Sequence, residues 1–265
     1  MKSLARTFMF GVLNLLFNSE VFSRGCAILM YHSVGENRVF FTVRPREFER
    51  QMEYLHKHDY SVISLSGLIE RLQQGGRNLK KCVVLTFDDG YRDNYANAYP
   101  VLKKYGFPAT IFVATGFIGQ SMDNAYHEPL PMLSWGELKE MAGSGIIDIE
   151  PHTIHHKKLT ELSSYEATAE IQESKKEIEE KLGKKCASFA YPHGSSSASV
   201  EDLARGAGFL AAVTTKEGII GQKNWNPFAL KRNSVDSTVN LVVFQAKLGF
   251  SNVLYHILKK YVSPS

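Results

Sequence analysis

The 265-residue chain lacks the features that mark several classes of protein. It has only three cysteines, far apart and without a CxxC pair, so we expect no disulfide framework but buried free thiols in a reducing compartment. Its 31 Lys+Arg and 27 Asp+Glu nearly balance at a net charge of +4 with no dominant basic block, which argues against a nucleic-acid partner. No apolar run is long enough to span a bilayer. At 44% hydrophobic residues, the chain has the composition of an ordinary globular protein.

The first 24 residues differ in pattern from the rest. Positive charges precede an apolar run over residues 7–17 (TFMFGVLNLLF), as in a signal peptide, but no small-x-small cleavage site follows. We expect residues 1–24 to form an uncleaved apolar helix, packed on the domain or in peripheral contact with a membrane through residues 7–17. This favours the cytoplasm or the cytoplasmic face of the membrane, with export through a poor signal segment as the alternative.

Residues 25–265 alternate short apolar runs with helical patterns, and no repeat or linker divides them. The runs typical of buried strands are 26–32, 82–87, 109–113, 146–150, 186–191 and 209–215, with a last one near 228–235. Helical spacing covers 44–58, 64–72, 94–105, 134–145, 164–185, 200–206 and 240–247. In the longest helix we expect Ile171, Ile178 and Leu182 to face inward and all Lys and Glu side chains to face solvent. Alternation of this kind predicts one α/β domain with a parallel sheet, open or closed into a barrel.

Unusual polar residues follow four of the predicted strands. These groups are Tyr31–His32, Asp88–Asp89–Gly90, the segment 152–156 (HTIHH) and Pro192–His193–Gly194. In parallel α/β folds the carboxyl ends of the strands share one face, where ligands bind. We therefore expect these groups to converge on one cleft.

The side chains in these groups have the chemistry of a catalytic metal site. Asp-Gly is common in turns, but two adjacent carboxylates after an apolar strand also allow one to hold a cation and the other to act as a base. His152 and His156 are four residues apart, which on a helical turn places both rings on one face; His155 would point elsewhere. Two neutral imidazoles and one carboxylate form a ligand set typical of catalytic zinc.

Together these parts predict metal-assisted hydrolysis. The metal would polarise a carbonyl and lower the pKa of its bound water, and the second carboxylate would take the proton of that water. A backbone N–H in the turn 191–194 is placed to stabilise the oxyanion. His32, on another strand end, is placed to protonate a leaving amine.

Three segments resemble the first three motifs of the polysaccharide deacetylase family, the NodB-homology type of carbohydrate esterase family 4. They are LTFDDGYRDNY (85–95), PHTIHHKKL (151–159) and FAYPHG (189–194), in the family's order and spacing. The resemblance covers about residues 26–235. It implies a distorted (β/α)7 barrel, a divalent metal that is usually Zn²⁺ with Co²⁺ or Ni²⁺ as alternatives, and removal of acetyl groups from sugars.

The resemblance also implies roles for single residues. Asp88 matches the family's general base. Asp89, His152 and His156 match the three metal ligands, and Thr153 is a supporting residue within the H-T-x-x-H motif. The set of ligands is therefore the same as the one that the residue types suggest.

The third motif and the surrounding sequence supply the candidates for substrate contact. The backbone N–H of His193 matches the oxyanion donor, where the family usually has Tyr or Trp. Tyr191 and Pro192 shape that wall of the groove. We also assign Tyr91 and Trp135 to substrate binding.

Two departures from the family pattern bear on catalysis. The third motif often starts with an Arg that orients the base, where this chain has Ala190, and the usual Leu-x-His acid near the carboxyl terminus is missing. The poly-N-acetylglucosamine deacetylase branch resembles the chain better, because its acid comes from the first strand, where His32 (MYHSV) lies. The residues that tune the active site in the family fall in the region of Lys231, Arg232 and Asp236. Of these, we assign Arg232 to substrate binding and Asp236 to a supporting role.

We therefore expect a metal-dependent enzyme that removes N-acetyl groups from a GlcNAc-type polysaccharide or a lipid-linked glycan. Because the amino-terminal segment is apolar, a deformylase that acts on a lipid-linked sugar is an alternative function. An O-acetyl esterase is a further alternative. A glycan-binding protein without catalysis is the non-enzymatic alternative, because of Ala190 and the missing terminal His.

Overall fold

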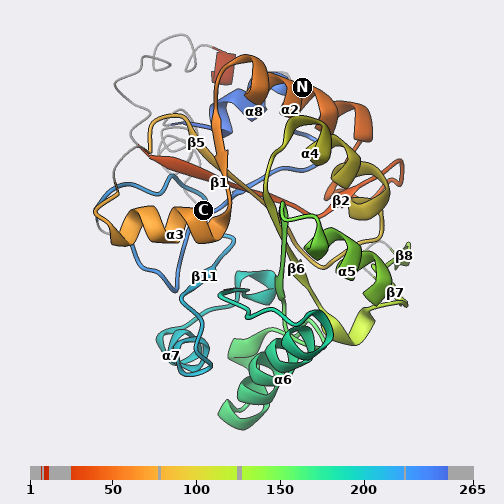
Figure 1. Cartoon of the computed structure of the whole chain (residues 1–265), viewed down its shortest axis with the longest axis vertical. Helices are drawn as coiled ribbons and strands as arrows, with labels where there is room; N and C mark the ends of the chain where they lie inside the picture. The colour runs from red at the N-terminus through yellow and green to blue at the C-terminus, as the bar shows by residue number, and fades with distance from the viewer. Residues whose placement is uncertain are drawn as a thin grey trace.

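The structure is a computed structural model that describes residues 7, 9–11, 25–76, 79–123, 127–223 and 225–249. Strands occupy its centre and helices cover the outside (Figure 1). The strands are β1 (Cys26–Tyr31), β2 (Ser33–Val34), β3 (Thr42–Val43), β4 (Ser61–Ile63), β5 (Cys82–Phe87), β6 (Ala109–Val113), β7 (Ser121–Met122), β8 (Leu130–Pro131), β9 (Ile147–Pro151), β10 (Ser188–Ala190), β11 (Ala211–Val213) and β12 (Asn233–Ser234). The α-helices are α2 (Pro45–Lys57), α3 (Leu65–Gln73), α4 (Tyr99–Tyr105), α5 (Trp135–Gly143), α6 (Ser164–Leu182), α7 (Ala198–Gly206) and α8 (Leu241–Lys247).

The central strands form an incomplete parallel barrel. One sheet runs in the order β12-β1-β5-β6-β9, with β4 paired to the first half of β5, and β10 and β11 form a second parallel pair. Val213 of β11 pairs with Leu230, just before β12, so the chain leading into β12 joins the two ladders. Within the described residues no backbone pairing joins β9 to β10, which leaves a break in the ring of strands there. The predicted α/β fold with a parallel sheet in a single domain is confirmed.

Side chains of β9 bridge this break in place of backbone hydrogen bonds. The buried carboxyl group of Glu150 accepts hydrogen bonds from the backbone N–H groups of Ala187 (3.2 Å) and Ser188 (2.9 Å). Just past the end of β9, Nδ1 of His152 lies 2.7 Å from the carbonyl oxygen of Ala190. These contacts satisfy backbone groups that would otherwise be buried without partners.

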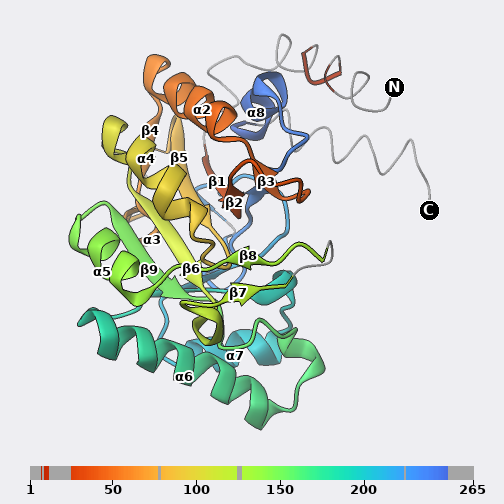
Figure 2. The same cartoon turned by 90° about the vertical axis from the view of Figure 1, so that its right-hand side faces the viewer.

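The helices begin and pack largely as their sequence patterns predict. Ser134 and Glu137 form the predicted capping box at the start of α5. A second capping box, Ser163 with Glu166, starts α6, which lies across one end of the molecule beside α7 (Figure 2). One expectation is wrong, since Glu170 of α6 faces the interior and is only 6% exposed.

Two predicted segments differ in detail from the structure. The helix expected over residues 94–105 is a π-helical turn, η2 (Asn94–Ala98), followed by α4. Pro100 explains the change, because it has no N–H to continue the regular i→i−4 ladder. The long connection between β6 and α5 contains the antiparallel hairpin β7–β8.

Most of the amino-terminal helix expected over residues 1–24 lies outside the described residues. Within the described part, Phe10 is buried in the main apolar core, and Nδ2 of Asn240 donates a hydrogen bond of 2.9 Å to Oγ1 of Thr7. None of the helices in the described ranges combines the length and the hydropathy needed to cross a membrane.

The β9–β10 bridge can be tested through the stability of the protein. Replacing Glu150 with Ala leaves the N–H groups of Ala187 and Ser188 without an acceptor, which costs about 2 kcal/mol or more of unfolding free energy. We expect Glu150→Gln, which keeps one acceptor oxygen, to be intermediate. Urea unfolding measures both variants, and equal stability of Glu150→Ala and wild type would contradict the bridge.

Candidate active site

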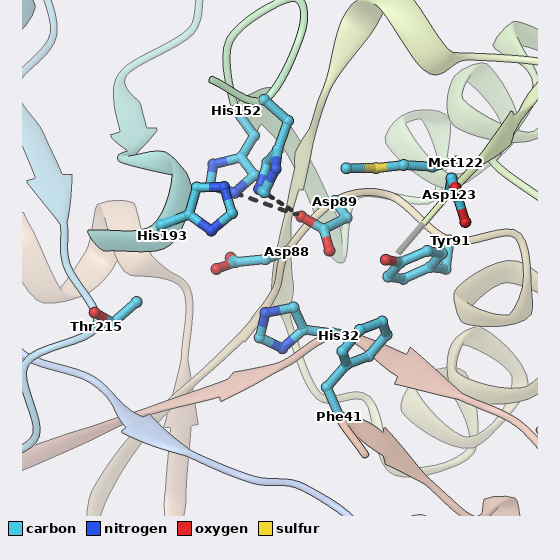
Figure 3. A pocket seen from close by; sticks show the side chains of 11 residues that line it. His32, Phe41, Asp88, Asp89, Tyr91, Met122, Asp123, His152, His193 and Thr215 are labelled. Carbon is cyan, nitrogen blue, oxygen red and sulfur yellow. Dashed lines mark ion pairs between the residues drawn. The ribbon is translucent and has the colours of Figure 1, made fainter. Parts of the chain in front are cut away.

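A cavity of about 480 Å³ opens at the carboxyl ends of the barrel strands. The strand register explains why polar residues meet there, because Tyr31 lies beside Phe87 and Val113 lies beside Pro151. The residues that follow these strands therefore emerge at one level. The predicted site residues that line the cavity are His32, Asp88, Asp89, Tyr91, His152, His156 and His193 (Figure 3).

Asp89, His152 and His156 form a cluster with the geometry of a metal site. Their potential ligand atoms all lie within 4.8 Å of one another. Oδ1 of Asp89 faces Nε2 of His156 at 3.2 Å and Nε2 of His152 at 3.6 Å. That oxygen is buried, and none of the described residues donates a hydrogen bond to it. A buried carboxylate oxygen facing two imidazole nitrogens fits a divalent cation of the zinc type.

The electrostatics of the cluster suit metal binding. Burial lowers the pKa of His152 to about 4, so its ring is neutral near pH 7, as a ligand must be. Burial opposes ionisation of Asp89, but the neighbouring rings of His156, His32 and His152 hold the pKa of this carboxyl far below its usual range. The cluster therefore offers one negative charge and an unprotonated His152 to a cation.

The segment that carries His152 and His156 is an irregular loop, so the predicted helical turn is wrong. Thr153 and His156 both have left-handed backbone conformations, with φ of 66° and 55°. The buried Thr153 supports the bend, since its Oγ1 accepts a hydrogen bond of 3.0 Å from the N–H of His156. His155 points away from the cluster, as expected, and its Nδ1 lies 2.7 Å from Glu170.

Asp88 is adjacent to Asp89 but has a different partner. Arg232 donates two hydrogen bonds of 2.6 Å to its two carboxylate oxygens, and both side chains are buried. Burial would raise the pKa of Asp88, but the charge and hydrogen bonds of Arg232 hold it below its usual value. The positive φ of Asp89, 71°, turns the chain so that the two carboxylates point to different partners.

This contact corrects the assignment of Arg232 to substrate binding. Its guanidinium is fully buried and outside the cavity lining, where Nε also donates to the carbonyl oxygen of Thr214 and Nη1 to Oγ1 of Thr86. The structure therefore places Arg232 against Asp88, where the family resemblance led us to expect an arginine at the position of Ala190.

The opposite wall of the cavity is aromatic. The ring of His32 lies 5.3 Å from that of Phe41, which stacks on Tyr91 at 5.4 Å. Nδ1 of His32 is buried and has no hydrogen-bond partner in the part of the chain that the structure describes. Burial and the negative charge of the nearby Asp89 raise the pKa of the Tyr91 hydroxyl. Tyr91 therefore lines the cavity close to a residue of the metal cluster.

The turn at 191–194 brings His193 to the rim of the cavity. His193 has a positive φ of 57°, and its ring centre lies 4.6 Å from that of His156. Gly194 is needed beside it, because a Cβ there would collide with the Thr215 side chain. Tyr191 and Pro192, which we assigned to substrate binding, are buried and do not line the cavity. The Tyr191 hydroxyl donates a hydrogen bond to the carbonyl oxygen of Phe228 instead.

Some predicted residues lie elsewhere, and some lining residues escaped prediction. Trp135 packs at the start of α5 near Lys181, and Asp236 accepts hydrogen bonds from Thr238; neither lines the cavity. The unpredicted lining residues are Phe41, Met122, Asp123 and Thr215. Phe41, Met122 and Asp123 do not come directly after a strand predicted from the sequence. Thr215 is the last residue of the predicted strand 209–215, but no unusual polar residue follows it.

Known proteins share this sequence and fold. The family model described as "Polysaccharide deacetylase" matches residues 75–212. YxkH of Bacillus subtilis, whose name carries the same family description, is 36% identical over 219 residues, which cover 83% of this chain and 74% of YxkH. A solved structure, the deacetylase PplD of Streptococcus pyogenes in complex with acetate, is 28% identical with a TM-score of 0.74, covering 84% of this chain and 98% of PplD.

A further relative is named for its substrate. The poly-beta-1,6-N-acetyl-D-glucosamine N-deacetylase of Staphylococcus aureus is 33% identical over 162 residues. The match covers 58% of this chain and 54% of that enzyme, so the chain spans about half of its length.

Metal titration tests the cluster directly. We expect protein freed of metal to bind one Zn²⁺ per chain, and zinc at about 1,000 times its Kd to add about 4 kcal/mol of stability. Asp89→Ala removes the charged ligand, so stoichiometric binding and the rise in melting temperature are both lost. Replacing the exposed His56 of α2 should change neither. Competition with a chromophoric chelator measures the affinities, and unchanged binding by Asp89→Ala would exclude this site.

Proposed function

This chain belongs to the polysaccharide deacetylase family, and on that premise we propose that it is a metal-dependent hydrolase of N-acetyl groups on a GlcNAc-type polysaccharide or lipid-linked glycan. One observation carries the proposal. Three candidate metal ligands share one cavity with a second carboxylate, Asp88, which is paired with the buried Arg232. The similarity to an enzyme named for poly-N-acetylglucosamine supports the choice of an N-acetylated sugar polymer.

The cluster fits a cation because a buried carboxylate oxygen, which accepts no hydrogen bond from the described residues, faces two imidazole nitrogens. Asp89, His152 and His156 would hold the ion. When bound, a divalent cation of this kind polarises a carbonyl group and makes a coordinated water more acidic.

Asp88 is suited to be the general base. Arg232 keeps the carboxylate ionised and fixes both of its oxygens, so it is ready to accept a proton from the attacking water. Asp88 lies outside the metal cluster, which leaves it free to change its protonation state during the reaction.

His32 is suited to be the general acid. It lines the cavity on the aromatic side, beside Phe41. In the reaction, the water oxygen bonds to the acetyl carbon and the C–N bond breaks. The proton donated by His32 goes to the leaving nitrogen, so that the products are acetate and a free amino sugar. The backbone N–H of His193, at the rim of the same cavity, is our candidate donor to the oxyanion.

Acetate release from N-acetylglucosamine oligomers tests the reaction. We expect zinc-loaded wild type to release acetate, and Asp88→Asn to lower kcat by about 100-fold or more because the base is lost. Asp148→Asn, an isosteric change in β9 outside the cavity lining, should retain activity. Release by Asp88→Asn at the wild-type rate would refute the mechanism, and zinc binding without any release would refute this substrate.

His32→Ala tests the proposed acid separately. Loss of the proton donor should lower kcat by about 100-fold or more while zinc affinity stays that of wild type. A substrate with a better leaving group, such as an activated acetyl ester, needs less protonation and should be affected less. Equal losses on amide and activated ester would argue that His32 only binds the sugar.

The Asp88–Arg232 pair predicts a change in pH dependence. Arg232→Lys keeps the charge but loses the two-pronged geometry, so the pKa of Asp88 should rise. The acidic limb of the kcat/KM profile then moves to higher pH, since the base is protonated sooner as pH falls. Arg205→Lys, in the exposed pair with Asp202, should leave the profile in place. An unshifted limb in Arg232→Lys would show that Asp88 does not control it.

A further inference from the structure

The loop from His152 to His156 follows a path that its own sequence disfavours. Two non-glycine residues, Thr153 and His156, have φ of 66° and 55°, in the left-handed region that side chains with a Cβ rarely adopt. The second of them is a member of the metal cluster. The surrounding structure must therefore impose this path if His156 is to face Asp89.

Backbone contacts hold one side of the loop. The N–H groups of Thr115 and Gly116, in the segment after β6, donate to the carbonyl oxygens of Thr153 (3.0 Å) and Ile154 (2.9 Å). Gly116 allows this close approach, because a Cβ there would lie 2.8 Å from the Ile154 oxygen. These bonds satisfy the carbonyl groups of the loop but leave its N–H groups to other partners.

A single side chain from α6 holds the other side. Oε2 of Glu170 accepts hydrogen bonds of 2.9 Å from the consecutive N–H groups of Ile154 and His155, and Oε1 lies 2.7 Å from Nδ1 of His155. Glu170 is 6% exposed, whereas the His155 ring is largely in solvent. Consecutive N–H groups next to a left-handed residue form a concave site for an anion. In this loop the carboxylate of Glu170 fills it.

We propose that Glu170 is a positioning residue for the metal centre: by holding the N–H groups of Ile154 and His155, it fixes the backbone that presents His156 toward Asp89. The inference rests on the proposed metal site. Although burial opposes ionisation, the hydrogen bonds from His155 and Ile154 lower the pKa of Glu170, so the carboxylate is charged near neutral pH. A carboxylate suits the task because its two oxygens serve three donors at once.

The neighbouring turn of α6 provides a matched control. Glu166 is also a glutamate with a structural contact, but it closes the capping box with Ser163 and is exposed. Removing Glu166 weakens the start of α6 without touching the loop. A loss of zinc affinity that follows from helix destabilisation alone would appear in Glu166→Ala as well.

The test is the zinc affinity of metal-free protein, measured by competition with a chelator, alongside the melting temperature without zinc. We expect Glu170→Ala to raise the Kd for Zn²⁺ by about 10- to 100-fold, the usual effect of losing an outer-shell contact. Glu166→Ala should lower the melting temperature and keep the wild-type Kd. Glu170→Gln retains an acceptor oxygen for the two N–H groups and should recover most of the affinity. His155→Ala removes only the ring contact and should bind zinc as wild type does.

The outcomes separate this inference from the proposed metal site. If wild type binds no zinc, the metal site itself fails. If wild type binds zinc and Glu170→Ala binds it equally well, Glu170 does not position the centre. The inference is also overturned if Glu166→Ala loses as much affinity as Glu170→Ala, since both would then report helix stability. If Glu170→Ala does not fold, the zinc affinities of Glu170→Gln, His155→Ala and wild type decide. A Glu170→Gln variant that binds zinc more weakly than His155→Ala would overturn the inference, because its retained oxygen would then not maintain the affinity.

Discussion

Two adjacent buried carboxylates cannot both remain charged unless each has its own counter-charge, and the site is organised around that constraint. Asp88 and Asp89 are 2% and 5% exposed. Asp88 is neutralised by Arg232, which is itself fully buried. Among the described residues, the ion-pair partners of Asp89 are the imidazoles of His152 and His156, and a divalent cation there would complete its neutralisation. Because their partners differ, Asp88 is paired with a cationic side chain, whereas Asp89 is available to a cation.

The constraint reaches into the barrel. Arg232 comes from the segment between β11 and β12, and it also bonds to Thr214 and Thr86 on either side. The arginine thus joins the two parallel ladders at the level of the cavity. Removing one partner of a buried pair costs about 3–5 kcal/mol because it leaves the other charge uncompensated. Asp88, the proposed base, is therefore held by an arginine that also links the two parallel ladders.

The sequence alone was enough to predict β1, β5, β6, β9, β10, β11 and β12 and the residues at their ends, because buried parallel strands are continuous apolar runs. It missed β4, which pairs with β5 but has only three residues, none of them fully buried. Asp88, Asp89, His152 and His156 were found in this way, and the cavity brings them together. Arg232 is paired across 144 residues, a contact that no local pattern contains. The burial of Glu170 could not be predicted for a related reason. In a helix rich in Lys and Glu, the sequence pattern places every charged residue on the solvent-exposed face. The path of the 152–156 loop opposes local backbone preference and exists only through tertiary contacts.

The β9–β10 break sets a boundary for motion within the fold. Along the main sheet, neighbouring strands are joined by ladders of backbone bonds, but between β9 and β10 the hydrogen bonds come from the side chains of Glu150, His152 and Cys186. Local opening with a low free energy should concentrate at this seam, which native-state hydrogen exchange would detect as fast-exchanging amides at Ala187 and Ser188. His152 belongs to both the seam and the metal cluster. An ion bound by His152 would therefore also fix the ring that contacts β10, so metal binding at the cluster and the β9–β10 contact would be linked through one side chain.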